Sequence, residues 1–250
     1  MKTKPKTNFQ RLLIAFTLII FNLNHLQGQS SEETLTKSFD QAIGKENLDI
    51  NNGIIHINEY RILNNKHRYY PNDKFEIGFV TYNNQNYYDI PIKYDIYKDI
   101  LIYRPLESDA ISIELIQKNV AVFNINNKKF VYLNNFYFSI IKLKPGYYEE
   151  NISGKNFTFY IRHHRNKREV LKGSSVFYEF DNDYEYFIEK NGAFNKVSSK
   201  KDLIKLFPQY KRKISDFYSS SKKMLKSDES LFYEKMMNYL NNEMVNNPSN

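Results

Sequence analysis

The chain has 250 residues and no cysteine, which excludes disulfide bonds, a cysteine nucleophile and a lipid-modified N-terminal cysteine. Its formal net charge is +8, but four of the 36 basic residues lie in the first eleven positions, leaving 32 basic against 28 acidic residues. Because the remaining charges are interspersed along the chain, we do not expect a nucleic-acid partner.

Residues 1–28 have the layout of a secretory signal peptide. Residues 1–11 are basic, residues 12–21 form an apolar run, and residues 22–30 are polar and include Gly28. A run of this length is too short for a membrane-spanning helix, which needs about 20 apolar residues. We therefore predict cleavage after Gly28 and an exported protein, periplasmic or outer-membrane-associated, that is not a lipoprotein and has no membrane span in its mature form.

Residues 29–250 are predicted to form a single domain. Residues 29–52 are expected to hold a linker and a short helix over 30–43, because Leu35, Phe39 and Ile43 recur four apart on one helical face. Residues 53–197 form a β-rich body, residues 198–245 are helical, and residues 246–250 form a frayed tail.

The β-rich body consists of short apolar and aromatic runs between turn signals. Asn126-Asn127 and Asn191-Gly192 favour two-residue hairpin turns. Gly78 lies inside a strand and indicates a bulge or a close approach of two backbones. Strands are predicted at residues 74–82, 87–95, 100–104, 111–116, 120–125, 128–133, 136–143, 157–162, 176–180, 184–189 and 194–197, after a weaker alternation at 55–60.

Helical spacing returns in the last fifty residues. Ser199 is a favourable N-cap with Asp202 three residues later, and Pro208 is expected to divide this stretch into two helices. A third helix is predicted from Ser227. Its apolar residues recur four apart: Phe232, Met236, Leu240 and Met244.

These elements predict the α+β class. We expect an antiparallel β meander of about ten strands, either a curved sheet or an open barrel, with a short N-terminal helix and two or three C-terminal helices.

No motif carries recognisable catalytic, metal-binding or cofactor-binding chemistry, so no cofactor is expected and ligand-binding residues stay unassigned. His163 and His164 are adjacent and would point to opposite faces of a strand, so they would not share a metal ion. They lie in the run RHHRNKR at residues 162–168, which we interpret as a solvated basic turn between strands. The alternative is an anion or phosphate site, as in contact with a lipid headgroup.

Paired carboxylates for glycoside hydrolysis are a further alternative, since such enzymes place two acids at a defined separation. The sequence alone does not show which two acids lie at that separation in the folded chain. The candidates are Asp89, Asp95, Asp99, Glu149 and Glu150.

A pattern of Gly, Tyr and Asp runs through the first half of the β-rich body. The segments GIIHINEY at 53–60 and HRYY at 67–70 precede it, and GYYE at 146–149 follows. The pattern is carried by Gly78, Val80, Tyr82, Tyr87, Tyr94, Asp95, Ile96, Asp99, Leu101 and Ile102. Together these motifs resemble a family of uncharacterised exported proteins of Bacteroidota. The resemblance covers most of the mature chain and implies a Gram-negative envelope protein without implying an active site. Arg68 departs from the proline that the resemblance would lead us to expect.

The sequence thus predicts an exported cell-envelope protein that acts as a non-enzymatic binding or accessory module. Its partner would be an unidentified envelope protein or an apolar ligand. One alternative is a periplasmic carrier of a lipid or another apolar ligand. The other is a hydrolase of glycans or peptides whose acidic residues are not yet placed.

Overall fold

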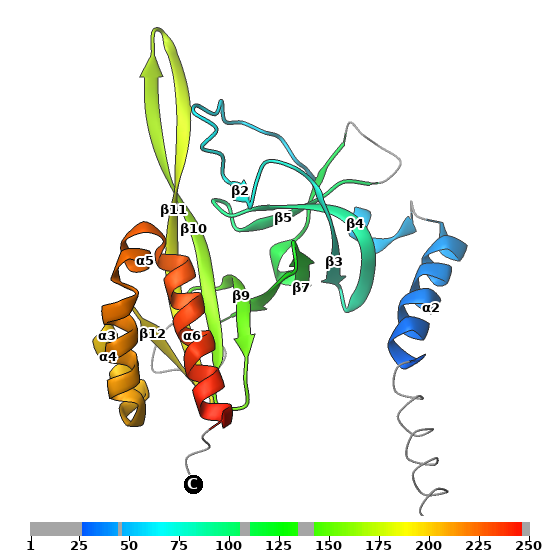
Figure 1. The fold of residues 1–250 in the computed structure, drawn as a ribbon. Coiled ribbons are helices and arrows are strands. Elements are labelled where there is room, and N and C mark those ends of the chain that lie inside the picture. The colour runs from blue at the N-terminus through cyan, green and yellow to red at the C-terminus, as the bar shows by residue number, and fades with distance from the viewer. Residues whose placement is uncertain (1–26, 45–46, 106–110, 135–142, 247–250) are drawn as a thin grey trace, which may run out of the picture. The chain divides into compact units, whose positions relative to one another are not determined.

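The computed structural model describes residues 27–44, 47–105, 111–134 and 143–246 (Figure 1). The predicted signal peptide, apart from its last two residues, and the strand predicted at 136–143, apart from its last residue, lie outside these ranges. The chain divides into two compact units, Met1–Leu48 and Asp49–Asn250. In the first unit, helix α2 (Gln27–Ile43) is the helix expected over 30–43.

The second unit contains a 12-stranded antiparallel sheet followed by helices, so the α+β class is confirmed. The strands are β1 (Ile54–Ile55), β2 (Tyr69–Tyr70), β3 (Glu76–Tyr82), β4 (Gln85–Asp95), β5 (Ile100–Tyr103), β6 (Ile113–Glu114), β7 (Val120–Ile125), β8 (Lys128–Leu133), β9 (Gly146–Ser153), β10 (Thr158–Lys172), β11 (Ser175–Lys190) and β12 (Ala193–Val197). The helices are α3 (Lys200–Leu206), α4 (Lys211–Ser220), α5 (Lys222–Ser227) and α6 (Glu229–Asn246), with short 3-10 turns η2 (Asp49–Asn51), η3 (Gln117–Asn119) and η4 (Pro208–Tyr210).

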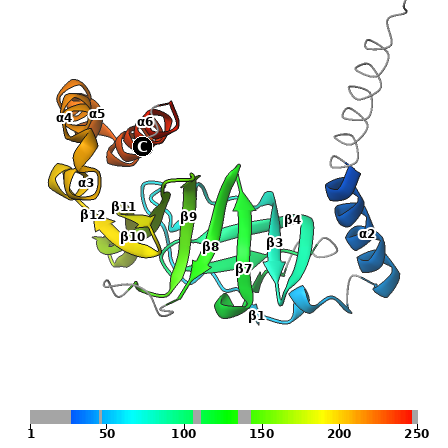
Figure 2. The same ribbon diagram turned by 90° about the horizontal axis from the view of Figure 1, so that it is seen from below.

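The sheet is open and is built as two meanders that start side by side. Its strand order is β1-β6-β5-β4-β3-β7-β8-β9-β10-β11-β12, with β2 paired to β4 off this path. Strands β3 to β6 therefore run outward on one side of the β3–β7 pair, and β7 to β12 run outward on the other. Figure 2 shows β3, β7, β8 and β9 next to one another, with the C-terminal helices at the β12 end.

Asparagine sets the hairpin turns. Both residues of Asn83-Asn84, Asn126-Asn127 and Asn191-Gly192 have positive φ, between 49° and 76°. Two-residue hairpin turns of type I′ need positive φ at both central positions, and Asn and Gly adopt it most readily. The turns predicted at 126–127 and 191–192 are confirmed, and they fix the ends of the strands on either side.

Gly78 meets both expectations for a glycine inside a strand. The β3–β4 register shifts between Gly78 and Val80, so a bulge is present. A Cβ atom at Gly78 would lie 2.4 Å from the carbonyl oxygen of Asn124 and 2.5 Å from Ile92 Cδ1. Any side chain at this position would force β3 away from its neighbours.

Groups of buried aromatic and aliphatic side chains hold the second unit together. Around the middle of the sheet, the Tyr94 ring packs on the rings of Phe123, Phe130 and Tyr147 at centroid distances of 5.2, 5.3 and 5.7 Å. Another group joins one face of β9–β12 to the C-terminal helices. Its members include Phe159, Ile161, Tyr186, Ile188, Leu203, Ile214, Phe232, Met236 and Leu240.

The C-terminal helices begin and end largely as expected. The Ser199 hydroxyl accepts a hydrogen bond from the Asp202 amide and caps α3, and Pro208 opens the turn that separates α3 from α4. Ser227 differs from the prediction, because it ends α5 and does not start the last helix. That helix is α6, and Asp228 precedes it with its carboxylate accepting a hydrogen bond from the Leu231 amide. The described part of the chain therefore has four C-terminal α-helices, α3 to α6, where two or three were expected.

The last hairpin is longer than predicted. The basic run 162–168 is not a turn but the middle of β10, and the strands predicted at 176–180 and 184–189 are one continuous strand, β11. The true turn is at Gly173, where φ is 63°. In Figure 1 the tip of this hairpin extends beyond α5 and α6.

A buried ion pair anchors the segment that leads into β2. The side chains of Arg68 and Asp95 are fully buried and form a charge-assisted hydrogen bond. The second carboxylate oxygen of Asp95 accepts the backbone N–H groups of Tyr97 and Lys98, both at 3.0 Å. The arginine that departs from the family resemblance is therefore the partner of the Asp95 that ends β4.

Replacing one member of this pair is expected to be costly, since the other charge stays buried alone. For Arg68→Met we expect the free energy of unfolding to fall by about 3–5 kcal/mol. The double variant Arg68→Met/Asp95→Asn should recover part of that loss, because asparagine keeps an oxygen for the two backbone N–H groups. Urea unfolding measures both, with exposed Arg61→Met as the control. A double variant no more stable than Arg68→Met would contradict the role of the charge pair.

Candidate functional site

Strand β10 distributes its basic run over both faces of the hairpin. Arg162 and His164 point to one face, while His163 and Arg165 point to the other, as alternation along a strand requires. The prediction that the two adjacent histidines would diverge is therefore confirmed. The face that carries Arg162 is opposite to the one on which Ile161 packs against the C-terminal helices.

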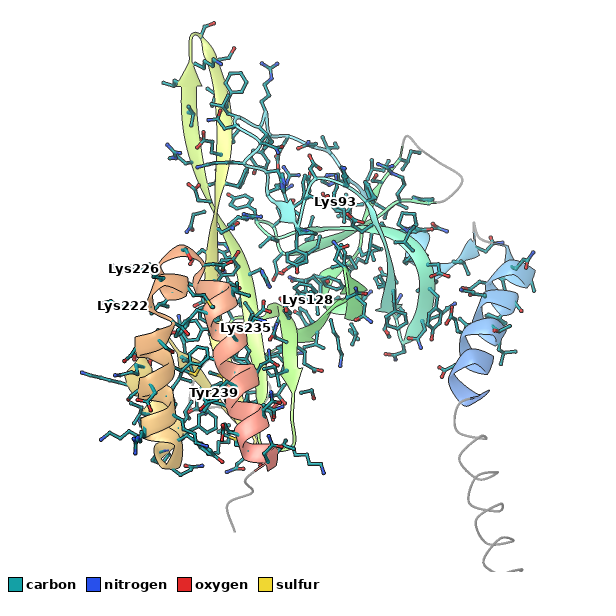
Figure 3. All side chains as sticks on the ribbon, in the orientation of Figure 1. Lys93, Lys128, Lys222, Lys226, Lys235 and Tyr239 are labelled. Atoms are coloured by element: carbon teal, nitrogen blue, oxygen red, sulfur yellow. The ribbon has the colours of Figure 1, made fainter. Side chains whose placement is uncertain are left out.

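His163 belongs to a buried ionic network. Its Nε2 lies 2.6 Å from a Glu149 carboxylate oxygen, and the other oxygen accepts hydrogen bonds from Asn151 at 2.7 Å and Lys128 at 2.8 Å. Lys128, labelled in Figure 3, also reaches Glu234 of α6 at 3.3 Å. The network thus connects β10, β9 and β8 to the last helix.

Glu149 is held as a carboxylate. Burial raises the pKa of this group, but the hydrogen bonds and charges of His163 and Lys128 outweigh that effect and lower its pKa from 4.5 to about 2. Glu149 is therefore unsuited to donate a proton at neutral pH, and its position is structural.

The opposite face carries the candidate site, which we call the Arg162 pocket. It has a volume of about 470 Å³. Its lining residues are Lys144, Tyr148, Arg162, His164, Asn166, Asp183, Glu185, Phe187 and Lys196. They come from the segment before β9 and from β9, β10, β11 and β12. Hydrogen-bonded pairing places Arg162 opposite Glu185 and His164 opposite Asp183, which brings the charged side chains together.

Most charges in the Arg162 pocket are already paired. Glu185 accepts hydrogen bonds from Lys196 at 2.6 Å and Arg162 at 3.2 Å. Burial raises the pKa of Glu185, but these two cations outweigh it and lower the pKa. Asp183 accepts a hydrogen bond from Asn166 at 3.2 Å.

Among the residues that line the pocket, cations outnumber acids. Burial and the charge of Arg162 lower the pKa of His164, so its ring is neutral at pH 7. Three cations, Lys144, Arg162 and Lys196, thus face two carboxylates. The aromatic rings of Tyr148 and Phe187 supply the apolar part of the lining.

The carboxylates suggested by the sequence do not converge. Asp95 is paired with Arg68 and Glu149 with His163, while Glu150 forms a separate ion pair with Lys129 at 2.8 Å. Asp89 has positive φ and an exposed side chain.

Asp99 is partly buried and has its own fixed donors, Tyr94 Oη at 2.7 Å and Gln117 Nε2 at 3.0 Å. The pKa of Asp99 is raised, because the effect of burial outweighs that of the hydrogen bonds that the carboxylate accepts. Among the described residues, no group of three or more His, Asp or Glu side chains is placed to hold a metal ion.

Sequence reasoning missed Asp183, Glu185 and Lys196. The signal was present in the segment DNDYE at 181–185, where acidic residues alternate as they do on one face of a strand. The polar residues 181–183 favour a break between two strands, whereas the structure continues β11 through them.

Comparisons with known proteins give no assignment, since no family model, curated protein or solved structure matches the chain. In the part of the chain that the structure describes, no helix is long and apolar enough to cross a membrane.

The network around Glu149 predicts a dependence of stability on acidic pH. Its pKa is lower in the folded chain than in the unfolded one, so its contribution is complete above pH 4.5 and is lost as the pH falls toward 2. For Glu149→Gln we expect a loss of roughly 3 kcal/mol at pH 7 and a flatter stability profile between pH 4.5 and 2.

Denaturant unfolding at a series of pH values measures this effect. Glu150→Gln is the matched control, because its surface pair with Lys129 should contribute less than about 1 kcal/mol. Equal losses in the two variants would show that the network does not stabilise the fold.

Proposed function

We propose that this chain is an exported cell-envelope protein that binds a small polar ligand in the Arg162 pocket and does not transform it. The observation that carries the proposal is that Glu185 is held as a carboxylate by two cations, Arg162 and Lys196. A carboxylate held in this way is a fixed recognition group and a poor general acid.

The lining of the pocket indicates the ligand class. Seven of its nine residues are charged or polar, and the other two are Tyr148 and Phe187. Such a surface suits hydroxyl, amide and carboxylate groups more than an apolar chain. A glycan fragment or a short peptide with an acidic group fits both the aromatic rings and the positive surplus. An apolar ligand, the carrier alternative, would find little matching surface there.

A hydrolase is the second candidate, because His164 and Asp183 face each other in the same pocket. A neutral histidine beside an acid could act as a general base. Turnover of a bound fragment would distinguish the two functions.

The pocket is tested by titrating the labelled protein with uronic-acid oligomers, chitooligosaccharides and short acidic peptides in an NMR experiment. We expect resonances of residues around Arg162 to shift with one of these probes. The variant Arg162→Gln should weaken that binding about tenfold or more, as loss of a charge-assisted hydrogen bond does. Arg212→Gln, an exposed arginine on α4, should bind like the wild type. No shift with any probe would contradict a polar ligand site, and cleavage lost in Asp183→Asn would establish the hydrolase.

Export is tested separately by fractionating the native host and sequencing the N-terminus of the mature protein. We expect an envelope fraction and an N-terminus at Gln29, within a few residues. An intact cytoplasmic protein that retains Met1 would overturn this part of the proposal.

A further inference from the structure

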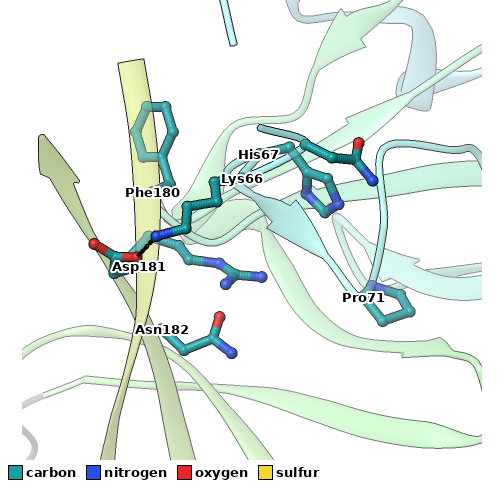
Figure 4. Close-up of a pocket in the computed structure, with 8 residues that line it drawn as sticks. Lys66, His67, Pro71, Phe180, Asp181 and Asn182 are labelled. Carbon is teal, nitrogen blue, oxygen red and sulfur yellow. Dashed lines mark hydrogen bonds and ion pairs between the residues drawn. The ribbon is translucent and has the colours of Figure 1, made fainter. Parts of the chain in front are cut away.

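A second pocket lies at the edge of the hairpin, where the segment before β2 runs along β11. Three backbone hydrogen bonds hold this segment in place: Leu63 N–H to Tyr178 O at 3.0 Å, Tyr178 N–H to Arg61 O at 2.8 Å and Phe180 N–H to Lys66 O at 3.0 Å. Between the segment and the hairpin is a pocket of about 260 Å³, which we call the Arg165 pocket (Figure 4). Its lining residues are Asn65, Lys66, His67, Pro71, Arg165, Phe180, Asp181 and Asn182.

The acids at this pocket are matched by other cations. Lys66 donates to Asp181 at 2.8 Å, as Figure 4 shows, and lies 3.4 Å from Glu179. Arg168 also pairs with Glu179 and approaches Asp181 at 4.0 Å. The positive charges of Lys66 and Arg168 therefore balance the two carboxylates.

Arg165 is left as the uncompensated charge. Within the described residues it has no carboxylate at ion-pair distance, and its side chain donates one hydrogen bond, from Nη2 to the carbonyl oxygen of Tyr69 at 3.3 Å. Its Nε is buried and has no hydrogen-bond partner. Burial lowers the pKa of Arg165, but a guanidinium stays protonated in proteins.

Neutral donors surround this charge. Burial and the charge of Arg165 lower the pKa of His67, so that its ring is neutral at pH 7 and donates from one nitrogen. His67 Nδ1 is buried without a partner, and the side-chain amides of Asn65 and Asn182 also line the pocket. A partly buried cation without a counterion, next to several neutral donors, is an arrangement that favours an anion.

We propose that the Arg165 pocket binds a phosphate group, either free or as part of a phosphomonoester. A guanidinium matches the geometry of a phosphate, and the donors come from three segments of the chain, which suits a tetrahedral anion with several oxygens. The site is separate from the Arg162 pocket, because the two pockets share no lining residue. Loss of one therefore leaves the other to be tested.

The experiment compares wild type, Arg165→Met, Arg165→Lys and the exposed control Arg212→Met by calorimetric titration with inorganic phosphate at constant ionic strength in chloride. We expect wild type and Arg212→Met to bind phosphate with the same affinity. In Arg165→Met the dissociation constant should rise about tenfold or more, with an intermediate value for Arg165→Lys, which keeps the charge and loses the planar fork. No phosphate binding by wild type, or equal binding by Arg165→Met, would overturn the proposal.

A stability measurement separates a ligand site from a structural role. In phosphate-free buffer Arg165→Met should be at least as stable as wild type, since an unpaired charge has been removed. Phosphate should reverse that order by stabilising only the wild type. If Arg165→Met were less stable with and without phosphate to the same extent, Arg165 would be structural and the proposal would fail.

Two further binding experiments distinguish a soluble phosphate compound from a lipid headgroup. Glycerol 3-phosphate represents a soluble phosphomonoester, and vesicles of phosphatidylcholine with or without phosphatidic acid represent a lipid headgroup. Binding of glycerol 3-phosphate that depends on Arg165 supports a soluble ligand. Arg165-dependent binding to the phosphatidic acid vesicles alone supports a headgroup. Failure of both, with phosphate also inactive, would exclude the site.

Discussion

The inner half of the last hairpin can be buried because its charged residues Arg162 and His163 each have a carboxylate partner. Strand β10 carries two histidines, three arginines and a lysine in seven residues, and the first four of these residues, 162–165, are buried or partly buried. On one face Glu149 and Lys128 receive His163 and connect the strand to α6. On the other face Glu185 receives Arg162. Removing charges from water is costly, so these pairings determine where the hairpin can lie.

This constraint also shows where function can be sought. In the buried networks each carboxylate has fixed donors, and those networks hold the fold. The two pockets differ because their charges do not cancel. The residues that line the Arg162 pocket include one cation more than acids. Among the described residues, Arg165 has no carboxylate at ion-pair distance, and its side chain donates to the Tyr69 carbonyl oxygen. Both surpluses are positive, and both lie on the same pair of strands.

The sequence was sufficient wherever a local signal fixed the structure. The limits of β7 and β8 were predicted to the residue, because Asn126-Asn127 marks the turn and apolar runs fill both sides. The bulge at Gly78 and the cap at Ser199 were also predicted, since each depends on one residue and its immediate neighbours. The run at 162–168 was misinterpreted because dense charge usually marks solvent, while the glycine that turns the chain is at 173.

The candidate site could not be predicted in the same way. Arg162 meets Glu185 only through the register of β10 on β11, and Lys196 joins them through a further strand. Arg68 and Asp95 are likewise 27 residues apart, and nothing local indicates that either is buried. Acidic residues occur at every second position of DNDYE. This spacing places them on one face only if residues 175–190 form one long strand.

The seam between β3 and β7 has a consequence for how the chain can assemble. Within each meander, neighbouring strands are also neighbours in sequence, so their hairpins close short loops. Thr81 pairs with Val122 across the seam, which closes a loop of about forty residues. Loop closure costs more entropy for distant contacts, and such contacts slow folding. The β3–β7 pair is thus one of the non-local steps of assembly, together with β1 on β6 and the segment before β2 on β11, and Gly78 lies on the strand where the two meanders meet.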